Sequence, residues 1–266
     1  MEIKLLGRLE ASFEGNSVAP TAAKPRQILA LLALNSGHVL PVSTLIEELW
    51  GDSPPPSVRT TMQTYIMQLR RLFQSAISDG GAKPKDILTT QCDGYLLDID
   101  PHDVDVCCYE EKLRAGYHAL ELGDDYAGSR LLSEALELWD GAALMDVRVG
   151  LPLSFEVTRL EESRLGALET RMAADMRLGR HQSLLAELAS LTARQPMQEN
   201  FCAHLMLALY RSGRQWQALE SYQRLRETLC DELGVDPSAR LQALHAAILR
   251  SDPALELPER VLAQVS

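Results

Sequence analysis

One stretch of the chain combines, at helical spacing, the residue types that contact nucleic acids. The segment Ser57–Phe73 (SVRTTMQTYIMQLRRLF) carries arginines, amides and small hydroxyls but no acidic residue, although the whole chain has a net charge of −11. Small hydroxyls let a helix enter a major groove, amides pair with base edges, and arginines reach guanine or phosphate. The candidate DNA-binding residues of this segment are Arg59, Thr60, Gln63, Thr64, Met67, Gln68, Arg70 and Arg71. The alternative interpretation is a solvated helix whose polar face has no function.

The apolar residues of the same segment indicate how it is held in place. Val58, Met62, Ile66, Leu69 and Phe73 recur at helical spacing and form a single stripe. Most of the polar candidates fall on the opposite side of the helix. The pattern therefore predicts one face packed on a core and one face open to a partner.

Two helices are predicted ahead of this segment. The first covers Lys24–Leu34, and Gly37 is its expected stop. The second covers Pro41–Trp50, where Thr44 and Glu47 have the spacing of a capping box.

Short strands are predicted on both sides of the three helices. Ile3–Phe13 alternates loosely between apolar and polar residues ahead of a turn at Gly15-Asn16, which predicts a small antiparallel sheet. After a polar loop at 78–85, residues 87–100 contain two β-prone runs around Asp93-Gly94, a strong hairpin signal. Strands, three helices and a terminal hairpin follow one another in a winged helix-turn-helix domain. The hairpin is then the wing, and its tip, Gln91, Cys92 and Asp93, is a candidate for the minor groove. The alternative is a hairpin that only closes the core.

From Val104 onward the pattern changes to successive helices. Gly179 and Gly213 are 34 residues apart, each followed six residues later by a leucine, and Gly123 lies in a similar but less regular segment. A 34-residue helix–turn–helix period is typical of tetratricopeptide repeats, here in a degenerate form. Four aromatic residues of this half are expected to pack between helices: Trp139, Tyr210, Trp216 and Tyr222. The predicted fold is thus mainly α with a small β component.

Composition excludes several classes of protein. The longest apolar run has seven residues, too short to cross a bilayer, and the N-terminus lacks a signal peptide, so a cytoplasmic protein is expected. The five cysteines contain no C-x-x-C pair and the histidines are scattered, so we expect reduced thiols, no metal and no cofactor. No phosphate-binding or hydrolase motif occurs, and we expect no enzyme activity. Residues 1–100 hold 9 Lys/Arg and 11 Asp/Glu, whereas the remainder holds 17 and 26, so the second half is not expected to touch DNA.

Four segments together resemble the Streptomyces antibiotic regulatory protein family. They are KPRQILALLAL (24–34), the stretch 45–73 with its Q-T-Y-I and L-R-R core, ILTTQCDGYLL (87–97), and the stretch 207–250 with E-L-G-V-D-P. The resemblance covers nearly the whole chain. It implies an OmpR-type winged helix-turn-helix at 1–100, a tetratricopeptide-like bacterial transcriptional activation domain at 101–252 and a tail at 253–266.

The resemblance also implies a function and partners. Family members activate secondary-metabolite gene clusters by binding direct repeats near the promoter −35 region and recruiting RNA polymerase. The expected partners are double-stranded operator DNA, the polymerase holoenzyme and a second copy of the chain, placed head to tail on DNA at the nucleoid. A different class stays open: a helical-repeat adaptor or ligand sensor whose N-terminal domain serves protein contacts. The acidic pI of about 5.1 favours that alternative.

Overall fold

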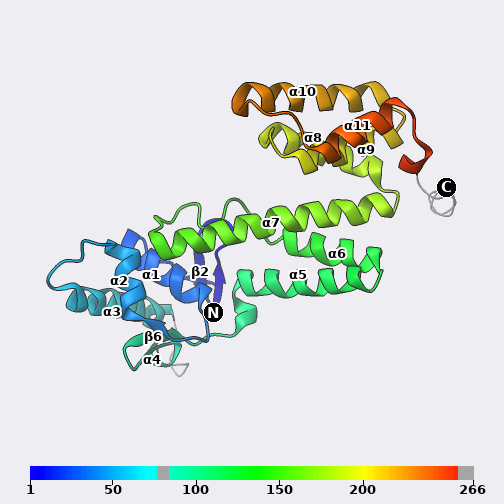
Figure 1. Ribbon diagram of the computed structural model, residues 1–266. Helices are drawn as coiled ribbons and strands as arrows, with labels where there is room; N and C mark the ends of the chain where they lie inside the picture. The colour runs from blue at the N-terminus through cyan, green and yellow to red at the C-terminus, as the bar shows by residue number, and fades with distance from the viewer. Residues whose placement is uncertain (77–83, 257–266) are drawn as a thin grey trace. The chain divides into compact units, whose positions relative to one another are not determined.

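The computed structural model describes residues 1–76 and 84–256 (Figure 1). Most of the predicted polar loop at 78–85 and the end of the predicted tail, 257–266, lie outside these ranges. The chain forms two compact units: Met1–Arg114 with Glu134–Leu165, and Ala115–Ser133 with Gly166–Ser266. The predicted boundary after residue 100 stays a prediction, because compactness alone does not define an independently folding domain.

The first unit begins with the expected antiparallel sheet. Its strands are β1 (Glu2–Lys4), β2 (Glu10–Phe13) and β3 (Asn16–Ser17), paired in the order β1-β2-β3. The predicted turn at Gly15-Asn16 is displaced by one residue. Glu14 and Gly15 turn the chain with φ of 48° and 82°, and Asn16 already pairs with Phe13.

Helix α1 (Ala23–Leu34) is buried on nearly all sides and forms the centre of the first unit. Such burial explains why its apolar run is continuous rather than striped. It packs against α2 (Val42–Trp50), α3 (Val58–Ala76) and the terminal hairpin. Two predicted end signals are wrong. The C-cap of α1 is Asn35 rather than Gly37, and α2 is preceded by Pro41 with no side-chain cap, so Thr44 and Glu47 form no capping box.

The terminal hairpin consists of β5 (Leu88–Gln91) and β6 (Gly94–Leu97), preceded by the short helix α4 (Pro84–Ile87). A strand that the sequence did not reveal, β4 (Leu40–Pro41), pairs with the other side of β6. Gly94 is therefore needed for close packing rather than for the turn. A Cβ atom there would meet the backbone oxygen of Leu40 at 2.6 Å, while Cys92 and Asp93 make the turn.

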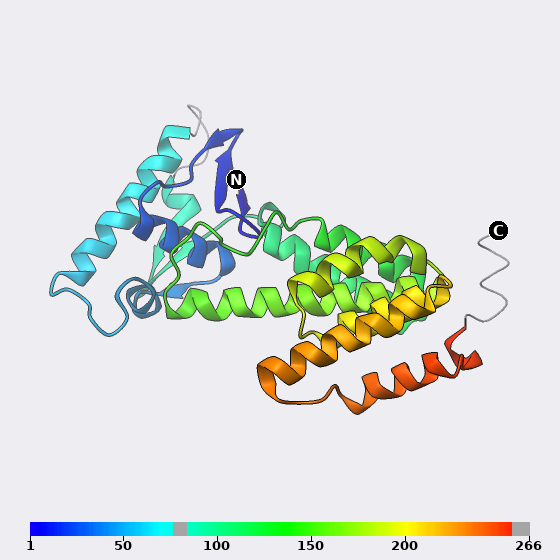
Figure 2. The ribbon, with the colours of Figure 1, turned by 90° about the horizontal axis from the view of Figure 1, so that it is seen from above.

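The remaining helices follow the repeat that the glycines indicate. They are α5 (Asp105–Glu121), α6 (Asp125–Leu136), α7 (Leu151–Arg177), α8 (His181–Arg194), α9 (Glu199–Arg211), α10 (Gln215–Leu233) and α11 (Ala239–Leu249). The described residues also form two 3₁₀ turns, Pro101–Asp103 and Pro253–Leu255. Gly123, Gly179 and Gly213 turn the chain within three successive helix pairs with φ of 81°, 77° and 73°. In the second unit α9 packs against both α8 and α10, and α11 lies along α10 (Figures 1 and 2).

The predicted burial of the aromatic residues is correct for two of the four. Trp139 and Tyr222 are buried and Tyr210 is half-buried, but the side chain of Trp216 is 67% exposed. Trp216 follows the turn glycine Gly213 by three residues, as Tyr126 follows Gly123, and Tyr126 is also exposed. In both helix pairs this residue lies in the first turn of the second helix, and its side chain is exposed. An aromatic residue at this position of the repeat therefore does not indicate burial.

Several carboxylates of the first unit bind backbone N–H groups far away in the sequence. Glu48 on α2 is buried and accepts from the amides of Gly150 and Leu153 at 2.5 and 2.9 Å, where α7 begins. It also accepts from Nε2 of Gln27 on α1 at 3.0 Å. A helix N-terminus has N–H groups without acceptors in the helix, and it favours a nearby negative charge. The Glu48 carboxylate provides both the acceptor and the charge.

Glu48→Gln is expected to lower the free energy of unfolding by about 1–3 kcal/mol, because the new amide presents a donor to N–H groups that need an acceptor. Chemical denaturation of the full chain measures the change. The matched control is Glu47→Gln, which alters the exposed neighbouring carboxylate and should leave stability nearly unchanged. Equal stabilities of the two variants would show that the Glu48 contacts contribute little.

Candidate nucleic-acid interface

Helix α3 separates its apolar and polar residues into two faces, as the sequence predicts. Met62, Ile66, Leu69 and Phe73 are buried against the rest of the unit, and Val58 is half-buried. The residues exposed on the helix include seven of the predicted contacts: Arg59, Thr60, Gln63, Thr64, Met67, Gln68 and Arg71. The helix lies at the outside of the unit (Figure 2, cyan) with no acidic residue along it.

The open face of α3 borders a hollow of about 740 Å³. The residues around it are Thr60, Gln63, Thr64, Met67, Arg70, Arg71, Gln74, Pro84 and Lys85. Gln74 and Lys85 were not among the predicted contacts. Gln74 lies two turns after Met67 on the same face, a signal the sequence contained, whereas Lys85 comes from α4, whose position the sequence did not indicate.

The three arginines of α3 have different surroundings. The Arg71 guanidinium is exposed, and its one contact in the described part of the chain is a long one, 3.9 Å to Sδ of Met67. Arg70 instead turns toward the hairpin, where Nε and one terminal nitrogen donate to the Leu88 oxygen at 2.9 and 2.7 Å. That terminal nitrogen also donates to Oγ1 of Thr90 at 2.9 Å. Arg70 thus fixes the hairpin against α3, and a DNA contact by its remaining nitrogen stays a prediction.

The tip of the hairpin lies beside the first turn of α3. Gln91, Cys92 and Asp93 are all exposed, and Cys92 adopts a positive φ of 47° in the turn. The Asp93 carboxylate is 3.4 Å from the Arg59 guanidinium, in an ion pair open to solvent. Pairing offsets the one negative charge at the tip, which would otherwise oppose an approaching phosphate.

No group of three or more His, Cys, Asp or Glu side chains within 1–76 and 84–256 is arranged to hold a metal ion. All five cysteines are free. None of the helices described has a stretch long and apolar enough to span a lipid bilayer.

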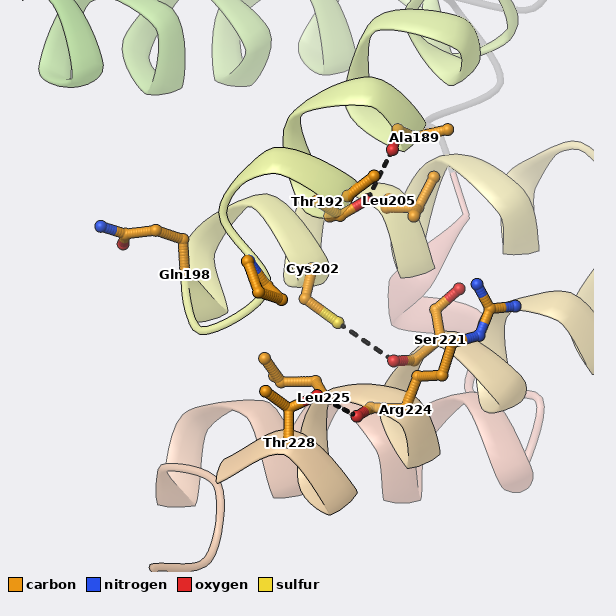
Figure 3. A pocket seen from close by; sticks show the side chains of 11 residues that line it. Ala189, Thr192, Gln198, Cys202, Leu205, Ser221, Arg224, Leu225 and Thr228 are labelled. Atoms are coloured by element: carbon orange, nitrogen blue, oxygen red, sulfur yellow. Dashed lines mark hydrogen bonds between the residues drawn. The ribbon is translucent and has the colours of Figure 1, made fainter. Parts of the chain in front are cut away.

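A separate pocket of about 250 Å³ lies among α8, α9 and α10 of the second unit. Figure 3 shows Cys202 inside it, pointing toward Ser221, whose backbone oxygen lies 3.6 Å from the sulfur. Burial raises the pKa of the Cys202 thiol to about 12, so this cysteine stays protonated and unreactive at neutral pH.

Comparisons with known proteins agree with this geometry. Residues 16–97 match the family model described as "Transcriptional regulatory protein, C terminal", and residues 104–249 match "Bacterial transcriptional activator domain". The chain is 53% identical to the regulatory protein DnrI of Streptomyces peucetius over 96% of this chain and 94% of that protein. The chain belongs to the Streptomyces antibiotic regulatory protein family.

Other relatives are longer. The transcriptional regulator RedD of Streptomyces coelicolor is 37% identical over 97% of this chain and 73% of its own length. The structure of EmbR from Mycobacterium tuberculosis, in complex with a low-affinity phosphopeptide, superimposes with a TM-score of 0.86 at 34% identity. That match covers 95% of this chain and 65% of the EmbR chain. As a member of the family, the protein is a transcriptional regulator with an OmpR-type winged helix-turn-helix. The assignment of α3 as the helix that reads DNA stays a prediction.

Arg71→Ala is expected to leave folding intact, because the side chain is exposed, and to weaken DNA binding by about 1–3 kcal/mol if the arginine pairs with a guanine. The loss should then be confined to operators that carry that base pair. Titrations against a panel of single-base operator variants measure it.

Arg70→Ala on the same helix serves as a comparison, because its guanidinium binds the hairpin. It should lower the stability of the unit through the hairpin, which thermal unfolding detects. Unchanged operator affinity of a folded Arg71→Ala variant would contradict the assignment of α3 as the reading helix.

Proposed function

We propose that the protein activates transcription of a secondary-metabolite, antibiotic-type gene cluster by binding direct repeats near the promoter −35 region and recruiting RNA polymerase. The observation that carries the proposal is the open face of α3. It is acid-free, it is separated from the buried stripe, and it borders a hollow whose rim includes Arg70, Arg71 and Lys85. The 53% identity to DnrI supports the type of target.

The acidic character of the chain is compatible with DNA binding, because the charge is unevenly distributed. The first 100 residues have a net charge of −2, and several of their acids are used internally: Glu48 binds Gln27 and the start of α7, and Asp93 pairs with Arg59. Phosphate contacts respond to the local charge of the surface that faces DNA rather than to the total.

A pair of protein copies on each operator follows from the size of the reading surface. A single helix in the major groove contacts too few base pairs for genomic specificity, so two copies bind adjacent sites. Direct repeats orient the two copies head to tail. The acid-rich residues after 104 then remain for contact with RNA polymerase, and tethering makes weak contacts effective. This role places the protein in the cytoplasm, on the nucleoid.

A gel-shift titration of promoter fragments at several salt concentrations tests the proposed function. Operator affinity should fall steeply as salt rises, because each phosphate contact releases counterions, and a scrambled operator should bind far more weakly. Salt-independent binding, or equal affinity for the scrambled control, would favour the adaptor alternative instead.

Inserting about five base pairs between the repeats should abolish cooperative binding, because it places the second reading helix on the opposite side of the duplex. Inserting about ten base pairs returns the second helix to the original side of the duplex and serves as the control. Quantitative footprinting measures the occupancy of each repeat. If both insertions bind with undiminished cooperativity, the two copies do not contact one another as proposed.

A further inference from the structure

On the side of α3 away from the hairpin, aromatic and basic side chains form a connected group. Trp50, at the end of α2, stacks on Tyr65 of α3 with ring centres 6.4 Å apart and planes at 23°. Nζ of Lys24, from the first turn of α1, lies 4.0 Å from the centre of the Trp50 ring. Lys24 therefore lies over Trp50, and Trp50 in turn packs on Tyr65 of α3.

A second cation, Arg148, lies beside the same aromatic group although it is far from Lys24 in the sequence. Lys24, Trp50 and Arg148 border one hollow of about 460 Å³, together with Val149–Leu151 at the start of α7. Partial burial, and next the positive charge of Arg148, lower the pKa of Lys24. Within the residues that the structure describes, neither cation forms an ion pair. Two like charges that border one hollow, with no direct ion pair to either, favour an anion from outside.

Two carboxylates, Glu48 and Glu47, also border the hollow, and they differ in their hydrogen bonds and exposure. The carboxylate of Glu48 is occupied by the amides of Gly150 and Leu153 and by Gln27. Glu47 is exposed on the rim. With Glu47 and Glu48 both counted, the formal charges around the hollow cancel, so a phosphate would be attracted by the local placement of Lys24 and Arg148 rather than by a net positive charge.

The hollow lies where a DNA strand would pass. An α-helix is about 10–12 Å wide and a major groove about 12 Å, so a helix in the groove has a phosphate strand along each side. The hairpin covers one side of α3, as the Arg70 and Arg59 contacts show. The start of α1 covers the other, because Ala19–Ala22 and Pro25, on either side of Ala23 and Lys24, border a smaller hollow with Gln68 and Arg71 of α3. Lys24 belongs to this second side.

We propose that Lys24 and Arg148 together bind a backbone phosphate of the operator on the side of α3 opposite the wing. The inference rests on the proposed function and extends it. Arg148 lies within the match to the activator domain at 104–249, so the DNA-binding surface includes a residue from outside the winged-helix segment. A phosphate contact adds affinity without reading sequence.

The test compares Arg148→Ala with Arg114→Ala in the full chain. Both substitutions remove one positive charge from an exposed side chain of the same unit. We expect Arg148→Ala to reduce the slope of log affinity against log salt by about 0.9 on every operator sequence. The ratio of wild-type affinity to Arg148→Ala affinity should then fall about threefold as the salt concentration rises from about 50 to about 200 mM. Arg148→Lys should keep most of the slope, because a phosphate accepts either cation, and Arg114→Ala should match the wild type.

Three results would overturn the site. One is a slope of log affinity against log salt that is the same for Arg148→Ala and Arg114→Ala, while the wild type binds DNA normally. Another is unchanged DNA affinity of Arg148→Ala with reduced activation in the presence of polymerase, which would assign the cations to an acidic protein surface. Absence of salt-dependent binding by the wild type itself would overturn the proposed function along with the site.

Discussion

The buried carboxylate of Glu48 is the contact on which the arrangement of the first unit depends. It joins three segments: α1 through Gln27, α2 through its own backbone, and the start of α7 through the amides of Gly150 and Leu153. A buried charge is tolerated only when its oxygens are satisfied, so these partners cannot separate without cost. Since α3 packs on α1, the position of α3 depends on a contact between residues about 100 positions apart in the sequence.

Other carboxylates of the first unit make similar contacts, away from the acid-free helix α3. Asp105 accepts from the amides of Leu5 and Leu6, and Asp146 accepts from the amide of Leu9 and pairs with Arg26. Burial raises the pKa of Asp105, and its backbone hydrogen bonds oppose that shift. Glu48, Asp105 and Asp146 therefore stabilise the fold, and the net charge of the chain says little about any one part of its surface.

Local patterns predicted most of the elements. Some errors are local, such as the turn displaced to Glu14-Gly15 and the exposed Trp216, and others arise from long-range contacts. The stripe from Met62 to Phe73 and the turn glycines Gly179 and Gly213 depend on spacing within a few turns of helix, so the sequence alone was sufficient. The role of Gly94 depends on β4, which comes from about 50 residues earlier, and the direction of Arg70 depends on the hairpin it contacts. Arg148 could not be recognised because only the fold brings it near Lys24.

Photo-crosslinking tests most directly whether the open face of α3 enters the major groove. A benzophenone amino acid would replace Thr64, at the middle of the exposed face, and, as a control, Leu122, which is 73% exposed in the second unit. We predict that the probe at position 64 crosslinks to bases of the operator repeat and that the probe at position 122 gives no DNA adduct. Operator crosslinks from position 122 and none from position 64, with normal affinity in both proteins, would contradict the assignment of α3.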